Sequence, residues 1–546
     1  MLIGIYLRTL RYLSVSQILF LLFRRIRRSI GKIELVERKS PSRDSSLKLK
    51  KTWNEPLEYE YDFNQDGEFN LFGESGNVFL DGWQGTTQTP LWKYHLHYFD
   101  FLLLEISSAD RGFGAKAIRH WVENNSIGKS PGWDPYPTSL RIVNWIKWCL
   151  AGNQLDAELN QSLYAQARYL RRNVERHLMG NHLIANLKAL IFAGRYFTGR
   201  EAKGWVTFAH KQLVLQLSTQ FEADGGHYEL SPMYHSIVIR DLLDILNLTE
   251  GLQISDADVT CIRQVCTSGL RWMQYMSHPD GKPAFFNDTN FSNSVPLESL
   301  LEYCAALRLD SWRTPLAVTS AVRASGYGRL ERRGVTVFCD VARVGASEQP
   351  GHSHADSLSF ELSAGTQRIF VNSGVSTYSD GSTRLWERST AAHNTIEINS
   401  ANSSEVWRSF RCGARAQVAV ELFEQTGDVI TLKAAHDGYA SGSRSVTHTR
   451  QWSLSSSRLH VVDLLEGRYS SAVSRLYLHP SLSVTAKGQF VEIVSPNGEV
   501  FAFKFYGGKL ELQNSYWSPY FGSQIPNQCI VMKLNGKKSE FIIEFQ

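Results

Sequence analysis

The hydrophobic pattern of this 546-residue chain changes its period near residue 330. Between about residues 90 and 320, apolar side chains recur three or four positions apart, as in the stripe of Leu183, Leu187, Leu190 and Ile191. Such spacing places them on one face of an α-helix. Later segments, such as "RGVTVFCDVA" and "VFAFKFYGG", alternate polar and apolar residues like half-buried strands. The pattern predicts a helical domain followed by an all-β domain.

Local signals mark where several elements begin and turn. In "SPMYHSIVIRDLLDIL", Ser231 is placed as the N-cap of a helix and Pro232 as its first residue. The pairs Asn497-Gly498 and Asn535-Gly536 are strong cues for hairpins between strands. Residues 36–90 read as an irregular lead-in. A chain of this length exceeds what one hydrophobic core usually serves, so we expect at least two domains.

The composition of the chain limits the kinds of molecule that it is expected to bind. The formal net charge of +5 is small for this length, so we expect no nucleic-acid partner. The 14 tryptophans and 22 tyrosines are numerous enough to line a sugar-binding cleft, although core packing accounts for most of them. The 7 cysteines are scattered without CxxC spacing and indicate neither a disulfide framework nor a thiolate metal site.

The first 32 residues combine apolar and basic side chains. Their longest apolar run, 18–23, is far shorter than the ~20 residues that span a bilayer. Arg8 and Arg11 interrupt the apolar stretch, and no small-residue cleavage pattern of a secretory signal is evident. Two alternatives remain: peripheral membrane contact through an interfacial helix on anionic lipid, or docking onto the body of the chain. We expect a cytoplasmic or inner-membrane-associated protein, with a periplasmic one as the alternative.

Two polar stretches in the helical half could carry chemistry. In "GNHLIAN", Asn181 and His182 open a helix, and His182 shares a face with Asn186. Asn181 could equally be a helix cap. In "DGGHYELSPMYHS", Tyr234 and His235 fall in the first turn of a helix, where negative charge is favoured, so a phenolate there could act as a base. Ordinary packing of the tyrosine is the alternative.

Three more stretches lie in the strand-rich half. In "GHSHADSLSFEL", His352, His354 and Asp356 would share one face if the strand register already holds at the start of the segment. Asn372 closes the strand in "FVNSG", and His393 opens another in "RSTAAHNTIEINS". His354 and His393 could provide two nitrogen ligands to zinc, with oxygen from Asn372 or Asp356. Hydrogen-bonded histidines without a metal are the alternative that spacing leaves open.

Taken together and in this order, these stretches resemble the heparinase II/III family of polysaccharide lyases, whose relatives include alginate and heparin lyases. The segments "PLWKYHLHYFDFL", "GWDPYPTSLRIVNWIKW" and "HPDGKPAFFND" also look like family segments. The resemblance covers roughly residues 85–415 through motifs. It implies an α+β multidomain chain with an α/α toroid over 90–325 and an antiparallel β-sandwich over 326–546, after a basic segment and lead-in over 1–89.

The resemblance also implies roles for single residues. Asn181 and His182 are implied at the substrate carboxylate, Tyr234 as the central acid or base, and His352 as a second proton-transfer group. A structural metal is implied at His354, Asn372 and His393. Further candidates for contact with an acidic sugar are His235, Tyr378, Arg141 and Arg388.

One position departs from the family pattern. Asn372 stands in "VNSG" where the family usually has an aspartate in a segment like "VDPG". A neutral amide oxygen is a weaker zinc ligand than a carboxylate. We therefore expect the zinc site to be weakened, lost, or completed by another residue.

The implied activity is cleavage of a uronic-acid-containing bacterial polysaccharide by β-elimination. Two alternatives stay open. A glycoside hydrolase on the same scaffold would need two carboxylic acids flanking the bond, for which Asp224, Glu229 and Asp288 are available. A non-catalytic polysaccharide-binding or assembly protein would keep the fold without turnover.

Overall fold

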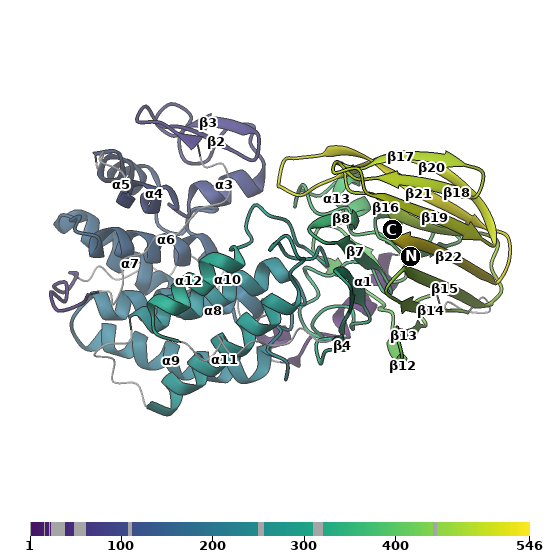
Figure 1. Cartoon of the computed structure of the whole chain (residues 1–546). Coiled ribbons are helices and arrows are strands. Elements are labelled where there is room, and N and C mark those ends of the chain that lie inside the picture. Colours follow the sequence, from purple (N-terminus) through teal and green to yellow (C-terminus); the bar gives the residue numbers. More distant parts are fainter. Residues whose placement is uncertain are drawn as a thin grey trace.

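The computed structural model describes residues 2–15, 17–20, 22, 39–48, 62–107, 112–248, 256–309, 320–439 and 445–545. It places a helical domain beside a strand-rich domain, in the order expected from the hydrophobic pattern (Figure 1). The chain passes from the first to the second between α12 (Leu297–Ala306) and β4 (Ala321–Val322).

The helical domain has an inner and an outer row of helices. The inner row runs from α4 through α6, α8 and α10 to α12, each packed on the next, and α5, α7, α9 and α11 cover it. Most side chains of α8 and α10 are buried, as an inner row requires. The helices are α3 (Pro90–Leu96), α4 (Phe101–Ser107), α5 (Gly112–Asn124), α6 (Pro135–Leu150), α7 (Ala157–Asn173), α8 (Gly180–Tyr196), α9 (Arg200–Gln220), α10 (Pro232–Asn247) and α11 (Asp256–Tyr275).

The sequence signals for two of these helices are confirmed. Ser231 caps α10, because its side chain accepts a hydrogen bond from the backbone N–H of Tyr234, and Pro232 is the first helical residue. The stripe of apolar residues predicted along α8 lies in the main core of the helical domain. The cap fixes the first turn of α10, which carries Tyr234.

The lead-in is more ordered than its composition indicated. A three-stranded antiparallel sheet is formed by β1 (Asp62–Phe63), β2 (Glu68–Leu71) and β3 (Glu74–Asn77). Phe69 of this sheet packs edge-on against Phe101 of α4, with ring centroids 5.2 Å apart. The expectation of an irregular segment is wrong here, because strands of only two to four residues are too short for their alternation to stand out in the sequence.

The strand-rich domain is an antiparallel sandwich. Its eight-stranded sheet has the order β12-β13-β14-β15-β22-β19-β18-β17. A shared core joins this sheet to a five-stranded sheet, β4-β5-β6-β7-β8, and a four-stranded sheet, β20-β21-β16-β9. Strand β14 alternates buried and half-buried residues along its length, the period expected of a sheet with one face inward.

The bounds of the strands follow. The five-stranded sheet holds β4, β5 (Tyr327–Arg332), β6 (Val335–Asp340), β7 (Phe360–Ala364) and β8 (Gln367–Phe370). The four-stranded sheet holds β9 (Ile396–Ile398), β16 (Ala472–Tyr477), β20 (Gly508–Trp517) and β21 (Ile525–Leu534). The eight-stranded sheet holds β12 (Val418–Thr426), β13 (Val429–His436), β14 (Val446–Leu454), β15 (Arg458–Gly467), β17 (Ser483–Lys487), β18 (Phe490–Val494), β19 (Val500–Tyr506) and β22 (Lys538–Phe545). A separate pair is β10 (Val406–Trp407) with β11 (Arg411–Cys412), and a short helix, α13, spans Ser382–Glu387.

One of the two hairpin predictions is confirmed. Asn497-Gly498 joins the paired strands β18 and β19. Asn535-Gly536 does not make a hairpin, because β21 and β22 belong to different sheets. The turn carries the chain from one layer of the sandwich to the other, a difference that the dipeptide alone does not encode.

A buried apolar cluster joins the two domains. It contains Trp272, Tyr275 and Phe286 from the helical side and Tyr327 and Phe338 from the first sheet of the sandwich. Tyr327 donates its hydroxyl hydrogen to the Leu230 carbonyl just before α10. The cluster therefore holds the start of α10 against the strand-rich domain.

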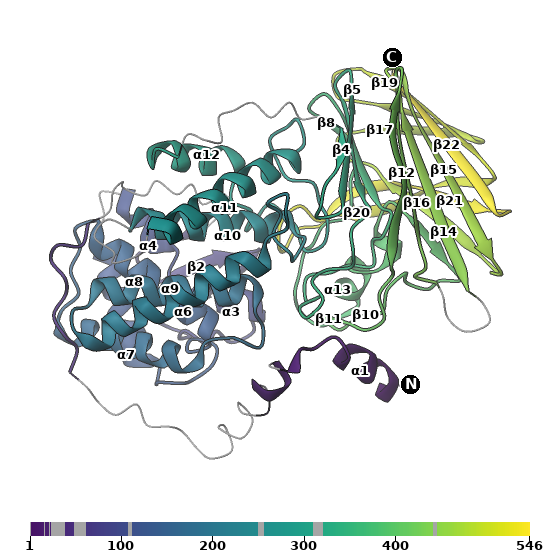
Figure 2. The ribbon, with the colours of Figure 1, turned by 90° about the horizontal axis from the view of Figure 1, so that it is seen from below.

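The N-terminal helix α1 (Leu2–Leu10) lies beside β10 and β11 (Figure 2). Arg8 binds both carboxylate oxygens of Glu405, and Trp407 donates its indole N–H to Thr9. Docking onto the body of the chain is thus observed for this helix, while its apolar Leu7 remains 63% exposed. Among the described residues, no helix is both long and apolar enough to cross a bilayer.

Candidate active site

Tyr234 and His352 meet at the junction of the two domains. Tyr234 comes from the first turn of α10, and His352 from the connection between β6 and β7. Their rings stack with centroids 3.8 Å apart and an interplanar angle of 28°. The Tyr234 hydroxyl also lies 3.0 Å from the hydroxyl of Tyr378. The structure thus brings together three side chains that lie far apart in sequence.

The carboxylate of Asp288 organises this group. One oxygen accepts a hydrogen bond from His352 Nδ1 (2.9 Å) and the other from His354 Nε2 (2.8 Å). Arg384 of α13 donates to both oxygens, at 2.6 and 2.7 Å. Burial acts to raise the pKa of Asp288, but Arg384 and the two histidines hold that pKa well below its usual range. Asp288 is therefore a buried, fully bonded carboxylate.

This carboxylate determines which nitrogen of His352 is basic. Because ionised Asp288 can only accept, Nδ1 of His352 carries the hydrogen and Nε2 carries the lone pair. A ring held in one tautomer by a buried carboxylate is suited to take a proton at Nε2. The roles of Asp288 and Arg384 were missed from the sequence: Asp288 stood only as a candidate hydrolase acid, and no sequence signal pointed to Arg384.

Asn181 and His182 lie in the first turn of α8, each tied to a carboxylate. Asn181 Nδ2 donates to Glu229, with distances of 2.9 and 3.1 Å to its two oxygens. His182 Nδ1 lies 3.2 Å from Glu175, which also accepts from Asn186 on the same face of α8. Asn181 does not cap the helix, because the N-cap position is Met179.

His182 is suited to bind an anion. Its side chain is 27% exposed, whereas that of Glu175 is 7% exposed. Burial acts to lower the pKa of His182, but Glu175, with a smaller contribution from Glu229, raises it above the usual value. The ring of Tyr136 packs against His182 with centroids 4.3 Å apart. A partly exposed imidazolium, braced by an aromatic ring, can receive a carboxylate.

Two of the residues expected to contact the sugar are buried inside the protein. Arg141 is fully buried in the helical domain, where it donates to Gln166 and to the His97 carbonyl and lies 3.9 Å from the ring centroid of Trp121. Arg388 is also fully buried and donates to the Ser353 and Arg408 carbonyls. Both expectations are corrected: these arginines brace the fold, because their donors are already engaged.

His235 is likewise a structural residue, while Tyr378 stays a site candidate. Nδ1 of His235 accepts from the His227 N–H, and Nε2 lies 2.8 Å from the Gly269 carbonyl, so both ring nitrogens are occupied. Burial lowers the pKa of His235 to about 4, so the ring is neutral. Tyr378, in contrast, contacts Tyr234 directly.

The predicted strand around His352 does not form. The segment between β6 and β7 is made of turns, and β7 begins only at Phe360. The two histidines nevertheless converge, because both reach the same carboxylate of Asp288. A loop, in place of the expected strand, thus brings His352 and His354 to one partner.

The metal candidates divide into two groups. His354 Nδ1 and His393 Nε2 face each other at 3.0 Å, and a carboxylate oxygen of Asp356 completes a compact set with them. Asn372 does not offer its amide in the same way: Nδ2 donates to the Phe285 carbonyl and Oδ1 accepts from the Asn394 N–H. The amide of Asn372 is thus hydrogen-bonded to the backbone through both its nitrogen and its oxygen, whereas Asp356 offers a carboxylate oxygen beside the two imidazoles.

The two facing nitrogens both carry lone pairs. His393 Nδ1 lies 2.7 Å from the Ser389 carbonyl, which can only accept, so the hydrogen of His393 is on Nδ1. His354 uses its Nε2 hydrogen on Asp288. No hydrogen then lies between the two facing nitrogens, and a cation bound between them would relieve their repulsion. The residues present therefore fit a divalent metal with two imidazole ligands and one carboxylate.

Family profiles match most of this chain. The profile for the heparinase II/III N-terminus matches residues 152–307, and the profile for the heparinase II/III-like C-terminal region matches residues 314–546. A heparin-sulfate lyase from Bacteroides stercoris is 22% identical over 320 residues, which make up 55% of this chain and 46% of that protein. The chain thus spans less than half the length of this curated relative.

Solved structures share the fold. A crystal structure of heparinase III has a TM-score of 0.68 at 17% identity, covering 86% of this chain and 80% of that one. A heparan sulfate lyase mutant from Pedobacter heparinus has a TM-score of 0.60 at 15% identity, covering 92% of this chain and 86% of that one. The expected α/α toroid followed by an antiparallel β-sandwich is confirmed. Since the two profiles take in residues 152–546 apart from 308–313, the chain belongs to the heparinase II/III family.

Proposed function

We propose that this protein is a polysaccharide lyase that cleaves a uronic-acid-containing bacterial polysaccharide by β-elimination. The observation that carries the proposal is the stacked pair of Tyr234 and His352, with His352 held in one tautomer by Asp288. The heparin-sulfate lyases among its relatives support an acidic polysaccharide as the substrate class.

The reaction removes the hydrogen on C5 of the uronate and expels the oxygen on C4. The C5 hydrogen is weakly acidic while the neighbouring carboxylate is charged, because the intermediate would carry a second negative charge. His182, as a partly exposed imidazolium, would bind this carboxylate and stabilise the developing enediolate, whereas the amide of Asn181 is buried and held by Glu229. Such a donor is worth about 3 kcal/mol in the transition state.

The two proton-transfer roles follow from the protonation states. Burial, together with Tyr378 and Asp288, raises the pKa of Tyr234 well above its usual value, so its hydroxyl stays protonated and suits the general acid. His352 Nε2, which carries the lone pair, suits the base that takes the C5 hydrogen. Tyr234 then gives its proton to the C4 oxygen, and Tyr378 stabilises the phenolate.

Product analysis tests the proposal. Purified protein is incubated with heparan sulfate, chondroitin sulfate and alginate, and the ultraviolet absorbance of an unsaturated uronate is followed. We expect this absorbance to rise on at least one uronate polymer. Cleavage with saturated new ends would identify a hydrolase, and binding without cleavage would identify an assembly protein. Hydrolysis is disfavoured, because Asp224, Glu229 and Asp288 are already bonded to Ser325, Asn181 and Arg384.

A structural divalent cation, best matched by zinc, is part of the proposal. His354, His393 and Asp356 would hold it. When bound, it would tie the loop before β7 to the segment before β9 and so keep His352 in place. A metal present at about a hundred times its Kd adds roughly 2.7 kcal/mol to the free energy of unfolding.

Metal removal gives a direct prediction. We expect the purified protein to retain zinc by elemental analysis, and expect a chelator to lower its melting temperature by several degrees. His393→Ala should lose the metal. His436→Ala is the matched control. This buried histidine also faces another imidazole, with its Nε2 3.3 Å from Nδ1 of His448, but here a hydrogen lies between the two nitrogens and bonds them. Equal zinc content in both variants would contradict the site.

The ion pair of His182 with Glu175 predicts a pH dependence of binding. Because the pKa of His182 is raised, the imidazolium persists above about pH 6.5 and is lost as the pH passes through the folded-state value. KM for an acidic polymer should therefore be lowest on the acid side and rise with pH. The contribution of this ion pair to the free energy of unfolding is likewise full below about pH 6.5, and it is lost as the pH rises through the folded-state pKa of His182. In His182→Asn the KM should lose this pH dependence, and a wild-type KM that stays constant from about pH 6 to 9 would contradict the role.

Peripheral contact with an anionic membrane is also proposed, consistent with a place beside polysaccharide synthesis at the inner membrane. Leu7 and Leu19 are exposed on the segment that Arg8 and Gln17 hold against the body of the protein. We expect the protein to float with vesicles that contain phosphatidylglycerol, and expect a Leu7→Glu, Leu19→Glu variant to bind less. Equal flotation of both proteins, or none with the wild type, would contradict it.

A further inference from the structure

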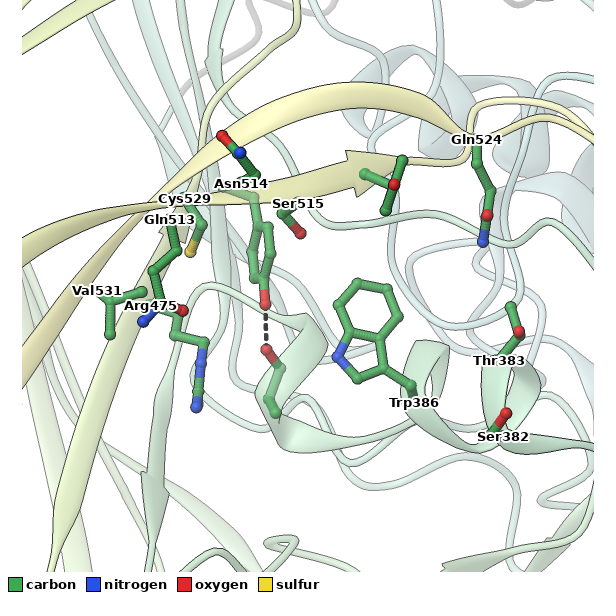
Figure 3. A pocket seen from close by; sticks show the side chains of 13 residues that line it. Ser382, Thr383, Trp386, Arg475, Gln513, Asn514, Ser515, Gln524, Cys529 and Val531 are labelled. Carbon is green, nitrogen blue, oxygen red and sulfur yellow. Dashed lines mark hydrogen bonds between the residues drawn. The ribbon is translucent and has the colours of Figure 1, made fainter.

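A hollow lies on the strand-rich domain, bordered by α13 and by strands β16, β20 and β21 (Figure 3). Its volume is about 510 Å³, and we call it the β-domain hollow. Trp386 of α13 points towards the strands, and its ring packs edge-on near Tyr477, with centroids 6.2 Å apart. Tyr516, half exposed on β20, is a further aromatic lining residue.

Neutral polar side chains surround these rings. They are amides and hydroxyls, each able to donate and to accept: Ser382, Thr383, Gln513, Asn514, Ser515 and Gln524. Aromatic faces pack on the apolar faces of sugar rings, and groups with both hydrogen-bonding roles match sugar hydroxyls. The lining therefore suits a saccharide better than a purely apolar ligand.

The charge of the lining selects an acidic saccharide. Arg475 is the one charged residue among the thirteen that line the hollow, and no carboxylate is among them. Nη1 of Arg475 donates to Glu397 at 2.9 Å, an ion pair between two partly buried side chains that offsets part of the arginine's charge. A guanidinium matches the planar carboxylate of a uronate or a sulfate group.

The β-domain hollow and the candidate active site share two chain segments. On helix α13, Arg384 donates hydrogen bonds to Asp288, and the hollow is lined by Ser382, Thr383 and Trp386 of the same helix. The connection from β20 to β21 places Gln524 in the hollow, and its Phe521 packs edge-on against Tyr378 with centroids 4.9 Å apart. Because the same two segments line the hollow and contact residues of the candidate active site, the fold fixes the position of the hollow relative to that site.

We propose that the β-domain hollow is a second binding site for the acidic polysaccharide, one that holds a segment of the polymer away from the reacting uronate. The inference rests on the proposed function, because it assumes that the polymer is the substrate. If the polymer occupies both sites, the protein should retain long chains better than short fragments. A chain held at the β-domain hollow has a raised effective concentration at the reacting group.

Hydrogen exchange on the full-length Tyr234→Phe protein locates the binding. With a hexasaccharide prepared from a polymer that the wild type cleaves, or from heparan sulfate if none is cleaved, we expect protection of peptides spanning 382–391 and 513–529, in addition to peptides around Tyr234 and His352. Protection around Tyr234 alone, at saturating hexasaccharide, would overturn the second site. Protection at neither place, together with no cleavage of any polymer, would overturn the proposed function itself.

Kinetics with a matched pair of variants gives a second test. Tyr516 and Tyr506 are exposed to 50% and 51%, and Tyr506 lies on β19 of the other sheet, outside the hollow. In Tyr516→Ala, the ratio of kcat/KM on the polymer to kcat/KM on a tetrasaccharide should fall about 2- to 10-fold, the value of one aromatic contact. In Tyr506→Ala this ratio should stay at the wild-type value. Equal ratios in all three proteins would overturn the proposal.

Discussion

Tyr234→Phe is expected to lower kcat on the uronate polymer by about 10²- to 10⁴-fold, the usual contribution of a positioned proton donor. The substitution removes one hydroxyl and keeps the ring that stacks on His352, so the surrounding packing is preserved. KM should change little, because the hydroxyl acts on the leaving oxygen and the carboxylate is bound by other groups. Initial rates from the ultraviolet absorbance of the unsaturated product measure the effect.

Tyr275→Phe is the matched control for this variant. Its hydroxyl is also buried and donates to the Ala321 carbonyl, but Tyr275 belongs to the apolar cluster between the domains. We expect Tyr275→Phe to lose about 1 kcal/mol of unfolding free energy with kcat retained. A similar kcat for Tyr234→Phe and the wild type would remove Tyr234 from the mechanism.

Asp288→Asn is expected to damage both stability and turnover. The amide keeps the shape of the side chain but removes the charge that Arg384 pairs with, and an unpaired buried arginine costs about 3–5 kcal/mol. The amide can also present N–H to His352 Nδ1, which allows the other tautomer and places the hydrogen on Nε2. We therefore expect kcat of the folded fraction to fall about 10²- to 10⁴-fold.

Asp463 provides an unusually close control for this variant. It is a buried carboxylate in the strand-rich core that accepts from His448 and binds Arg450 with both oxygens. Asp463→Asn should destabilise the protein by a similar amount, measured by denaturant unfolding, with kcat of the folded fraction unchanged. If both variants lose kcat equally, Asp288 acts only through stability.

The fold was largely predictable, because the patterns that encode it are local. The period of apolar residues distinguishes helices from strands, and the Ser231-Pro232 pair marks the start of α10 at the residue where the structure begins it. The two hairpin cues show the limit: Asn497-Gly498 joins paired strands, but Asn535-Gly536 joins different sheets. Which strands pair depends on contacts distant in sequence, and a turn dipeptide does not contain them.

The candidate site was predictable only in part. The resemblance named Asn181, His182, Tyr234 and His352, and the structure stacks the last two. Arg141 has the chemistry of a sugar-binding arginine, but it is buried in the helical core with its donors engaged. A residue type states what a side chain can do, and burial decides whether a ligand can reach it.

By itself, the sequence determined the succession of helices and strands and the chemical types available to the site, because both depend on residue identity and short spacings. Tertiary structure decided which groups meet. It placed Asp288 between His352, His354 and Arg384, and brought the carboxylate of Asp356 beside the imidazoles of His354 and His393. The physical reason is that ionised hydrogen-bond partners must find one another when they are buried away from water, and chain distance does not constrain which partners those are.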